Sequence, residues 1–484
     1  MRLLMILSLL ALPLRADLRT DIDSFARKAM TQIGTAPGIT VVVVKDDRVV
    51  YRGDFGLRDV EKNLPVTPET RFYIASTTKA FTAMAAAILA EEGKLDLDAP
   101  ITNVWPEVKL TPPLDAKRFS LRDFLAMRSG LGNDTINFRI GALGNLTGEE
   151  ELLRVLATYS RDQPRTFRYS NMSYILAARV MEKATGKRWT ELVAEKVLIP
   201  LDMTSTTTSL PPPGVTVAQF YRSPASNTFV RTQDKTDDTM GPAGGMLTTG
   251  ADAAKWLIAL MNDGRAGGKQ VLPKRAVRVV QSEQTVNKAR FRYFDRFAWG
   301  LGQDLAYYEG DLLIQRFGGF GGAYSHVSFM PEHRIGVAAF SNGGGAVPDA
   351  VAAYAYDLLL GKKNLDAKWQ AELAKVVAAV AAAREERRKA DARLAERHEP
   401  AHPIAQYAGA YHYDRLGDLQ ITESNGRLHA QLGRLRAELV PAGGDAFLID
   451  WTDEGELSSI RIDFDASGRA ARFDWEGRVF DRVP

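Results

Sequence analysis

A serine and a lysine three positions apart are the first residues in this sequence whose types and spacing could do chemistry. Ser76 and Lys79 lie where an apolar run, 72–74, gives way to a helical pattern that ends near Glu91. Positions three apart share one face of a helix, so the Ser76 hydroxyl and the Lys79 amine can meet. Apolar surroundings would partly desolvate Lys79, which lowers its pKa and lets it act as a base. The pattern predicts a serine nucleophile, although a helix cap beside a solvated lysine gives the same spacing.

Tyr169 and Asn171 form a second cluster, just before a helical pattern over 174–184. A phenol beside an ammonium group loses its proton more easily and can relay protons between the serine and a leaving group. The Asn171 amide can hold both a lysine and a substrate carbonyl. The alternative interpretation is that this segment only forms a turn and a helix cap.

A glycine-rich stretch, 317–322, follows directly after a predicted strand. It lacks the Gly-Lys-Ser/Thr ending of a phosphate-binding loop, which argues against nucleotide binding. Glycines at this place let a substrate lie against backbone N–H groups.

The composition argues against several other kinds of chemistry. The 484 residues contain no cysteine, which rules out disulfides and thiolate catalysis in this sequence. All six histidines lie at position 326 or later and no Gly-x-Ser-x-Gly occurs, which disfavours a Ser-His-Asp triad. Residues 398–402 match His-Glu-x-x-His, but Pro400 would interrupt the helix that such a zinc site needs, so no metal is expected. The near balance of 62 basic and 59 acidic residues offers no argument for a nucleic-acid partner.

The N-terminus predicts export. Residues 1–16 combine a short basic start, an apolar core of about 12 residues and a small residue at the end, which is typical of a secretory signal peptide. We therefore expect a periplasmic or secreted protein with no integral membrane span after signal removal.

Strand and helix signals predict two domains. Apolar, β-branched runs lie early and late in the first 362 residues, with helices between them, which indicates one antiparallel sheet that brings both ends together. The early strands are expected at 38–44 and 49–53, and the late ones at 299–308, 312–317, 325–330 and 335–341. A charged, alanine-rich helical linker is expected over 363–400. Six short strands within 401–484 predict a small β-barrel or sandwich.

Taken in order, the three motifs resemble those of the serine β-lactamase and penicillin-binding-protein superfamily. The nearest branch contains class C β-lactamases, D-aminopeptidases, DD-carboxypeptidases and related esterases (peptidase family S12). The resemblance covers about residues 22–362, and the tail is similar to a lipocalin-like β-domain. The resemblance implies an α/β (α+β) fold with two domains. The hydrolase domain, 17–362, would hold an antiparallel sheet flanked by helices and an all-helical subdomain, and the C-terminal domain would be a separate β-barrel.

The resemblance also implies roles for individual residues. Ser76 would be acylated, with Lys79 and Tyr169 sharing acid–base work. Asn171 would orient Lys79 and the substrate amide. The backbone N–H groups of Ser76 and Gly319 would form the oxyanion hole.

The third motif departs from the family pattern. Arg316 and Phe317 stand where lysine or histidine and threonine are usual, followed by Gly318. Arg316 could bind a substrate carboxylate through a two-pronged contact, or it could point to solvent from the strand end. Phe317 and Phe320 could line a site for apolar acyl groups, or could only pack.

These features predict an exported serine hydrolase without a cofactor, acting on a small ester, a D-amino-acid peptide or a β-lactam. The alternative is a penicillin-binding or sensor-type protein that is acylated without efficient turnover. A third reading is an inactive relative that works through its β-domain. Substrate choice is expected to depend on loops at 200–240 and 285–296, and oligomeric state is not predicted.

Overall fold

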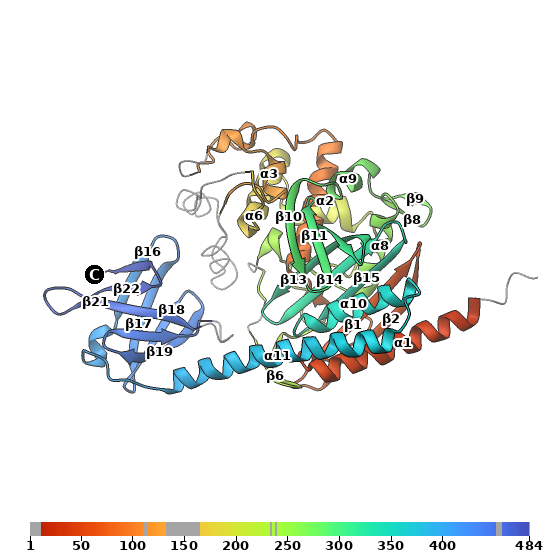
Figure 1. Cartoon of the computed structure of the whole chain (residues 1–484). Coiled ribbons are helices and arrows are strands. Elements are labelled where there is room, and N and C mark those ends of the chain that lie inside the picture. The colour runs from red at the N-terminus through yellow and green to blue at the C-terminus, as the bar shows by residue number, and fades with distance from the viewer. Residues whose placement is uncertain are drawn as a thin grey trace, which may run out of the picture.

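The computed structural model describes residues 11–110, 115–131, 165–232, 235–237, 240–451 and 457–483, with side-chain detail from residue 18 onward. A layered α/β domain and a C-terminal barrel are joined by the long helix α11 (Leu365–Ala395) (Figure 1). Most of the predicted signal peptide, residues 1–10, lies outside the described residues. The first described element is α1 (Ala11–Ile33).

The core of the first domain is a nine-stranded antiparallel sheet in the order β10-β11-β12-β13-β14-β15-β1-β2-β3. In β1 each residue opposes one of β15, from Ile39 against Ser341 to Lys45 against Ile335, which confirms that early and late strands meet. The strands are β1 (Gly38–Lys45), β2 (Arg48–Asp59), β3 (Leu64–Pro65), β10 (Thr285–Phe291), β11 (Phe294–Trp299), β12 (Asp304–Tyr308), β13 (Asp311–Phe320), β14 (Ala323–Met330) and β15 (Ile335–Ser341).

Both faces of this sheet are covered, which explains why β1 reads as a continuous apolar run. Successive side chains of a strand point to opposite faces. Val41 and Val43 enter the apolar core that α1 and α10 (Ala346–Leu359) share with the sheet. Val42 and Val44 enter the opposite core, which includes α2 (Thr78–Glu91) and α8 (Gly250–Met261).

The helices beside the sheet complete the predicted architecture. Ser120 and Asp123 form a capping box at α3 (Leu121–Leu125), and Gly186, at φ +70°, ends α6 (Asn171–Thr185) in the left-handed region. The other described helices of this domain are α7 (Trp189–Val193) and α9 (Lys274–Val280). The fold-class prediction is confirmed, while parts of the predicted helical region, 111–114 and 132–164, lie outside the described residues.

Three local predictions are wrong. The single strand expected at 299–308 is broken at 300–303, where Gly302 adopts φ +83° between β11 and β12. The substrate loop expected at 285–296 consists of β10 and the start of β11, at the sheet edge. The region 200–240 is not loop throughout, because β5 (Tyr221–Ala225) and β6 (Thr228–Arg231) form a hairpin within it.

The C-terminal domain is a closed barrel of eight antiparallel strands in which β16 meets β23. Two more strands are present than predicted, and they are the first and last, which close the barrel. Alternate apolar side chains fill the interior, as in β18, where Leu428, Ala430 and Leu432 are buried. The strands are β16 (Gly409–Tyr413), β17 (Gly417–Ser424), β18 (Arg427–Leu432), β19 (Leu435–Gly443), β20 (Ala446–Ile449), β21 (Ser458–Phe464), β22 (Ala470–Trp475) and β23 (Arg478–Arg482).

Three further features complete the fold. Short strand pairs link the loops of the first domain: β4 (Phe72–Tyr73) with β7 (Leu247–Thr248), and β8 (Arg265–Ala266) with β9 (Lys269–Gln270).

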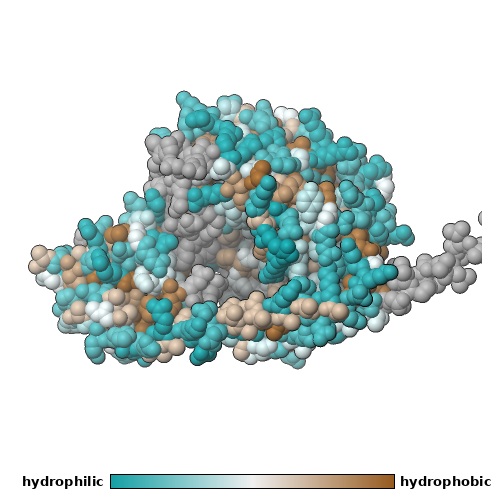
Figure 2. All heavy atoms as spheres, in the orientation of Figure 1, coloured by the Kyte–Doolittle hydropathy of each residue, from teal (hydrophilic) through white to brown (hydrophobic). Residues whose placement is uncertain are grey.

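On the face shown in Figure 2, tan, weakly apolar residues follow the alanine-rich α11. Over the described ranges, no helix has both the length and the apolar character that crossing a bilayer requires.

Candidate active site

Ser76 lies in a tight turn between a short strand and a buried helix. β4 leads into the 3₁₀ turn Ala75–Thr77, and α2 begins at the next residue. Ala75 has φ +43°, a region that residues with a Cβ rarely adopt, so the turn is locally strained. Ser325 of β14 secures the turn, because its Oγ donates to Ile74 O over 2.7 Å. The turn therefore presents a partly exposed hydroxyl from a fixed backbone.

Lys79 occupies the buried side of Ser76. Its Nζ lies 3.0 Å from Ser76 Oγ, 2.6 Å from Asn171 Oδ1 and 2.5 Å from Ala243 O. The side chain is fully buried. Burial lowers the pKa of Lys79 well below the usual lysine range, and the nearby positive charge of Arg316 lowers it further.

Three acceptors at these distances would also suit an ammonium group, but the lowered pKa of Lys79 favours the neutral amine. A neutral lysine has two N–H groups and one lone pair. Asn171 Oδ1 and Ala243 O can only accept hydrogen bonds, so they take the two N–H groups. The lone pair is left for the hydroxyl proton of Ser76, which is the arrangement that a general base requires.

Tyr169 contacts the same hydroxyl from another side. Its OH donates to Ser76 Oγ over 2.8 Å and accepts from Arg316 Nη2 over 2.6 Å. Burial raises the pKa of Tyr169, although Arg316 and the hydrogen bond with Ser76 oppose this shift. A neighbouring cation therefore acts in the expected direction, since Arg316 lowers the pKa of Tyr169, but burial outweighs it. The neutral phenol is a proton donor at the serine.

Arg316 belongs to this hydrogen-bonded cluster and does not point to solvent. It is 5% exposed, and its Nε donates to Ser76 O over 3.0 Å. Its Nη2 bonds Tyr169 and its Nη1 bonds Asp304, at 3.4 Å. These bonds use three of the five guanidinium N–H groups, and the side chain is 5% exposed, so little of Arg316 is open to the expected two-pronged contact with a substrate carboxylate.

Asp304 is the residue that sequence reasoning missed. It is fully buried at the start of β12 and faces Arg316, Arg296 and Asn287. Burial raises the pKa of Asp304, and the two arginines oppose that shift. The sequence signal that could have pointed to an acidic partner is Arg316 in an apolar strand, because a buried cation needs a counter-charge.

Gly318 brings β13 directly against the nucleophile turn. A Cβ built at Gly318 would lie 2.5 Å from both Ile74 O and Ser76 N, closer than real Cβ atoms come. At Gly319 a Cβ would meet the Tyr324 ring at 3.4 Å, which is an ordinary contact. The strand thus approaches the Ser76 N–H as closely as a glycine allows, and Gly319 follows at an exposed position.

The aromatic residues of the third motif pack against other rings. Phe317 stacks on Phe291 with ring centres 4.0 Å apart, and Phe320 meets Tyr73 at 5.9 Å. Phe317 and Phe320 are each partly exposed. Packing is therefore observed for both rings, while the lining of a substrate site by them stays a prediction.

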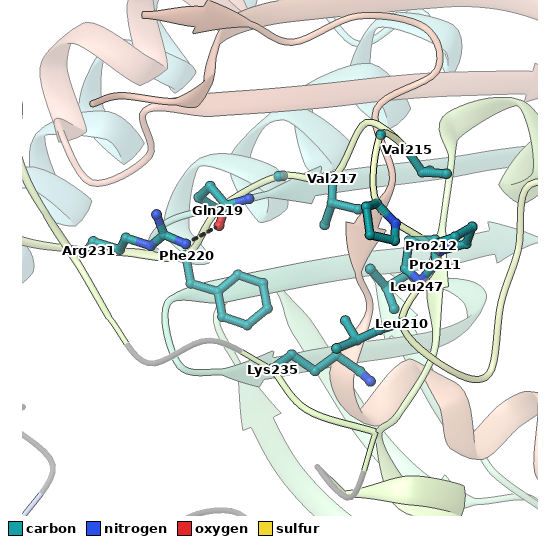
Figure 3. A pocket seen from close by; sticks show the side chains of 13 residues that line it. Leu210, Pro211, Pro212, Val215, Val217, Gln219, Phe220, Arg231, Lys235 and Leu247 are labelled. Atoms are coloured by element: carbon teal, nitrogen blue, oxygen red, sulfur yellow. Dashed lines mark hydrogen bonds between the residues drawn. The ribbon is translucent and has the colours of Figure 1, made fainter. Parts of the chain in front are cut away.

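A pocket of about 370 Å³ is lined by residues 210–215 and 217–220 together with Arg231, Lys235 and Leu247 (Figure 3). Leu247 pairs with Tyr73, three residues before Ser76. Part of the loop that was expected to govern substrate choice thus lines a cavity next to the site.

Two other candidate constellations do not form accessible sites. His326 joins Ser328 at 2.6 Å and Asp349 at 2.7 Å, which resembles a triad, but all three are at most 1% exposed. His402 of the His-Glu-x-x-His sequence stacks on Phe464. In the described part of the chain, no group of three or more potential ligands could hold a metal ion.

Comparisons with known proteins agree with this geometry. A sequence model of the β-lactamase family matches residues 25–362, and one of a domain of unknown function (DUF3471) matches 395–482. An unguisins hydrolase of Aspergillus campestris is 28% identical over 341 residues, which cover 68% of this chain and 62% of that protein. Protein flp of Staphylococcus aureus is 29% identical over 192 residues, or 40% of this chain and 38% of its own length. The chain thus spans less than two thirds of the length of these relatives.

Solved structures show the same fold over nearly the whole chain. The octameric penicillin-binding protein homologue from Pyrococcus abyssi has a TM-score of 0.63 at 23% identity, covering 96% of this chain and 99% of that chain. A structure described as SurE has a TM-score of 0.55 at 19% identity, covering 97% and 100%. Because the β-lactamase match extends over more than half of the sequence, the chain belongs to the β-lactamase family of serine hydrolases.

Proposed function

We propose that this chain is an exported hydrolase that cleaves an ester or amide through an acyl-enzyme on Ser76. The carrying observation is that Lys79, whose pKa is lowered by burial, lies 3.0 Å from Ser76 Oγ while Asn171 Oδ1 and Ala243 O accept from its nitrogen. Export is inferred from the signal-like residues 1–16. Support for hydrolysis comes from the family and from the Aspergillus relative that is named a hydrolase.

In the acylation step, Ser76 Oγ attacks the substrate carbonyl carbon while Lys79 Nζ takes the hydroxyl proton. The carbonyl oxygen becomes negative, and the N–H groups of Ser76 and Gly319 are the proposed donors to it. The bond to the leaving group then breaks, and the Tyr169 hydroxyl supplies its proton. Lys79 then gives the proton that it took from Ser76 to the Tyr169 phenolate, so both groups return to their starting state. Water repeats the sequence on the acyl ester and releases a carboxylic acid.

The substrate class follows from the bonding of Arg316. Since Arg316 is 5% exposed and already bonds Ser76 O, Tyr169 and Asp304, substrates without a terminal carboxylate fit this site better than carboxylate-terminated peptides. Small esters and internal amides are therefore the preferred substrates, ahead of the β-lactams. The partly exposed Phe317 and Phe320 favour apolar acyl groups.

Intact-mass spectrometry tests the proposal. The purified protein is mixed separately with a fluorophosphonate, a p-nitrophenyl ester and a penicillin, and any adduct is mapped. A transient ester adduct on Ser76 with steady product release is expected, and Ser76→Ala should lose both while keeping its folded circular dichroism spectrum. A lasting penicilloyl adduct without turnover would replace the hydrolase by the penicillin-binding alternative. Undiminished hydrolysis by Ser76→Ala would refute the assignment.

A further inference from the structure

The carbonyl of Ala243, which accepts from Lys79, belongs to a tight loop rather than to a long helix or strand. Residues 241–243 form a single 3₁₀ turn, which is entered through Met240 at φ +62° and Gly241 at φ +39°. Met240 has a Cβ, and such residues seldom adopt the left-handed region. A backbone in this conformation persists only where surrounding groups hold it.

Helix α2 holds this loop through side chains on the face that carries Lys79. Thr82 lies three residues after Lys79, so the two side chains share one face of the helix. Thr82 Oγ1 donates to Pro242 O over 2.8 Å. Lys79 Nζ donates to the next carbonyl, Ala243 O, over 2.5 Å. Two consecutive carbonyl groups of the loop are therefore bonded by two side chains of one helix.

Trp189 fixes the direction of the Thr82 hydroxyl proton. Its indole Nε1, at the start of α7, can only donate, and it donates to Thr82 Oγ1 over 3.0 Å. Thr82 has one hydroxyl proton, and its two acceptors are Pro242 O at 2.8 Å and Thr78 O at 3.4 Å. The shorter contact takes the proton. Thr82 and Trp189 are at most 4% exposed, so bulk water does not compete for these bonds.

The loop is folded so tightly that its two carbonyl groups move together. Gly245 N donates to Gly241 O over 2.6 Å, and a Cβ at Gly245 would lie 2.8 Å from the same oxygen. Pro242 and Ala243 lie inside this closed turn. A shift of Pro242 O therefore also shifts Ala243 O.

We propose that Thr82 is a positioning residue for the general base and acts through the loop carbonyl that bonds Lys79. The hydroxyl of Thr82 holds Pro242 O, and the turn thereby fixes Ala243 O against the lysine amine. With one N–H held there, the lone pair of the neutral amine stays directed at Ser76 Oγ. This inference rests on the proposed function, because it takes Lys79 as the base that activates Ser76.

The pH dependence of acylation distinguishes positioning from a general loosening of the core. Losing the contact with Ala243 O should lower the pKa of Lys79 further, because a carbonyl oxygen stabilises an ammonium group more than a neutral amine. Loosening that admits water would raise this pKa towards the ordinary lysine value. The described titratable or charged groups around Lys79 are Tyr169, Tyr174 and Arg316, and a substitution elsewhere on α2 keeps all three.

Stopped-flow labelling of Ser76 by a fluorophosphonate, followed across pH, tests the proposal on the whole protein. Thr82→Val keeps the shape of the side chain but removes the hydroxyl, so labelling on the high-pH plateau should slow by about tenfold or more. The rise of its rate with pH should move to lower pH by about half a pH unit or more. Thr82→Ser keeps the hydroxyl and should label within a few-fold of the wild type, with an unchanged pH profile.

Thr82→Cys supplies a further variant for the case that Thr82→Val does not fold, as judged by thermal melting. Its thiol is a weaker donor than a hydroxyl, so its labelling rate should lie below that of Thr82→Ser. Equal labelling by folded Thr82→Val, Thr82→Cys and Thr82→Ser would overturn the proposal. A pH profile of Thr82→Val that stays in place or moves to higher pH would also overturn it.

Failure of the proposed function gives a different result. A wild type that is not labelled on Ser76, or a Ser76→Ala variant that still hydrolyses the p-nitrophenyl ester, would overturn the hydrolase assignment and this inference with it. If Ser76 is labelled and Ser76→Ala is inactive, equal rates in the Thr82 variants refute only the role of Thr82.

Discussion

Replacing Gly318 by alanine tests whether the close approach of β13 to the nucleophile turn matters for catalysis. The added Cβ would lie 2.5 Å from Ile74 O and Ser76 N, so it must move by about 0.9 Å to reach ordinary contact at 3.4 Å. Both clashing atoms are backbone atoms, and Ser325 secures the turn that carries them. The strain must therefore displace either β13 or the turn.

This displacement should raise the free energy of the transition state. A displacement of about 1 Å near reacting groups, or the loss of one oxyanion donor, typically reduces kcat by about 10²-fold or more. That factor corresponds to about 2.7 kcal/mol. Gly318→Ala should therefore lower kcat on a p-nitrophenyl ester by about 10²-fold, with little change in KM, and slow fluorophosphonate labelling of Ser76.

Gly319→Ala is the matched control. It keeps the backbone N–H, and its Cβ meets only the Tyr324 ring at 3.4 Å, so kcat should stay within a few-fold of wild type. Thermal melting of both variants distinguishes a loss of folding from a displacement of β13 or the nucleophile turn in a folded protein. If folded Gly318→Ala labels and turns over as fast as Gly319→Ala, the close approach has no catalytic role and the reasoning fails.

Three further predictions concern the groups around the nucleophile. Tyr169→Phe removes the hydroxyl that joins the serine to Arg316, so kcat should fall by about 10²–10⁴-fold. Tyr174→Phe, which loses only a bond to a carbonyl, should cost about 1 kcal/mol in chemical unfolding and keep kcat; equal kcat losses would contradict this distinction. Because burial lowers the pKa of Lys79, the rate of acylation should rise with pH through that lowered pKa and then level off, and a rate that falls over this range would exclude a neutral-lysine base. Asp304→Asn leaves the buried Arg316 without its counter-charge and should destabilise the fold by about 3–5 kcal/mol, so an unchanged urea midpoint would show that the pair has no structural role.

Sequence patterns predicted most strands of the sheet because the signal for each strand is local in the sequence. β1 and β15 are continuous apolar runs, and a strand buried on both faces requires such a composition. The break at 300–303 was missed although its sequence, Gly-Leu-Gly-Gln, contains two glycines, one of which, Gly302, adopts the left-handed conformation. The closing strands β16 and β23 were missed because partly exposed residues dilute their apolar pattern.

By itself, the sequence identified the candidate reacting groups. Ser76 and Lys79 are three residues apart, so helix geometry alone predicts their contact, and the motif order adds Tyr169 and Asn171. Tertiary structure alone decided how they are protonated and partnered. Ala243 O reaches Lys79 across 164 residues, and Asp304 reaches Arg316 through the pairing of β12 with β13. Burial and hydrogen-bond partners set pKa values, and both arise only when distant segments pack together.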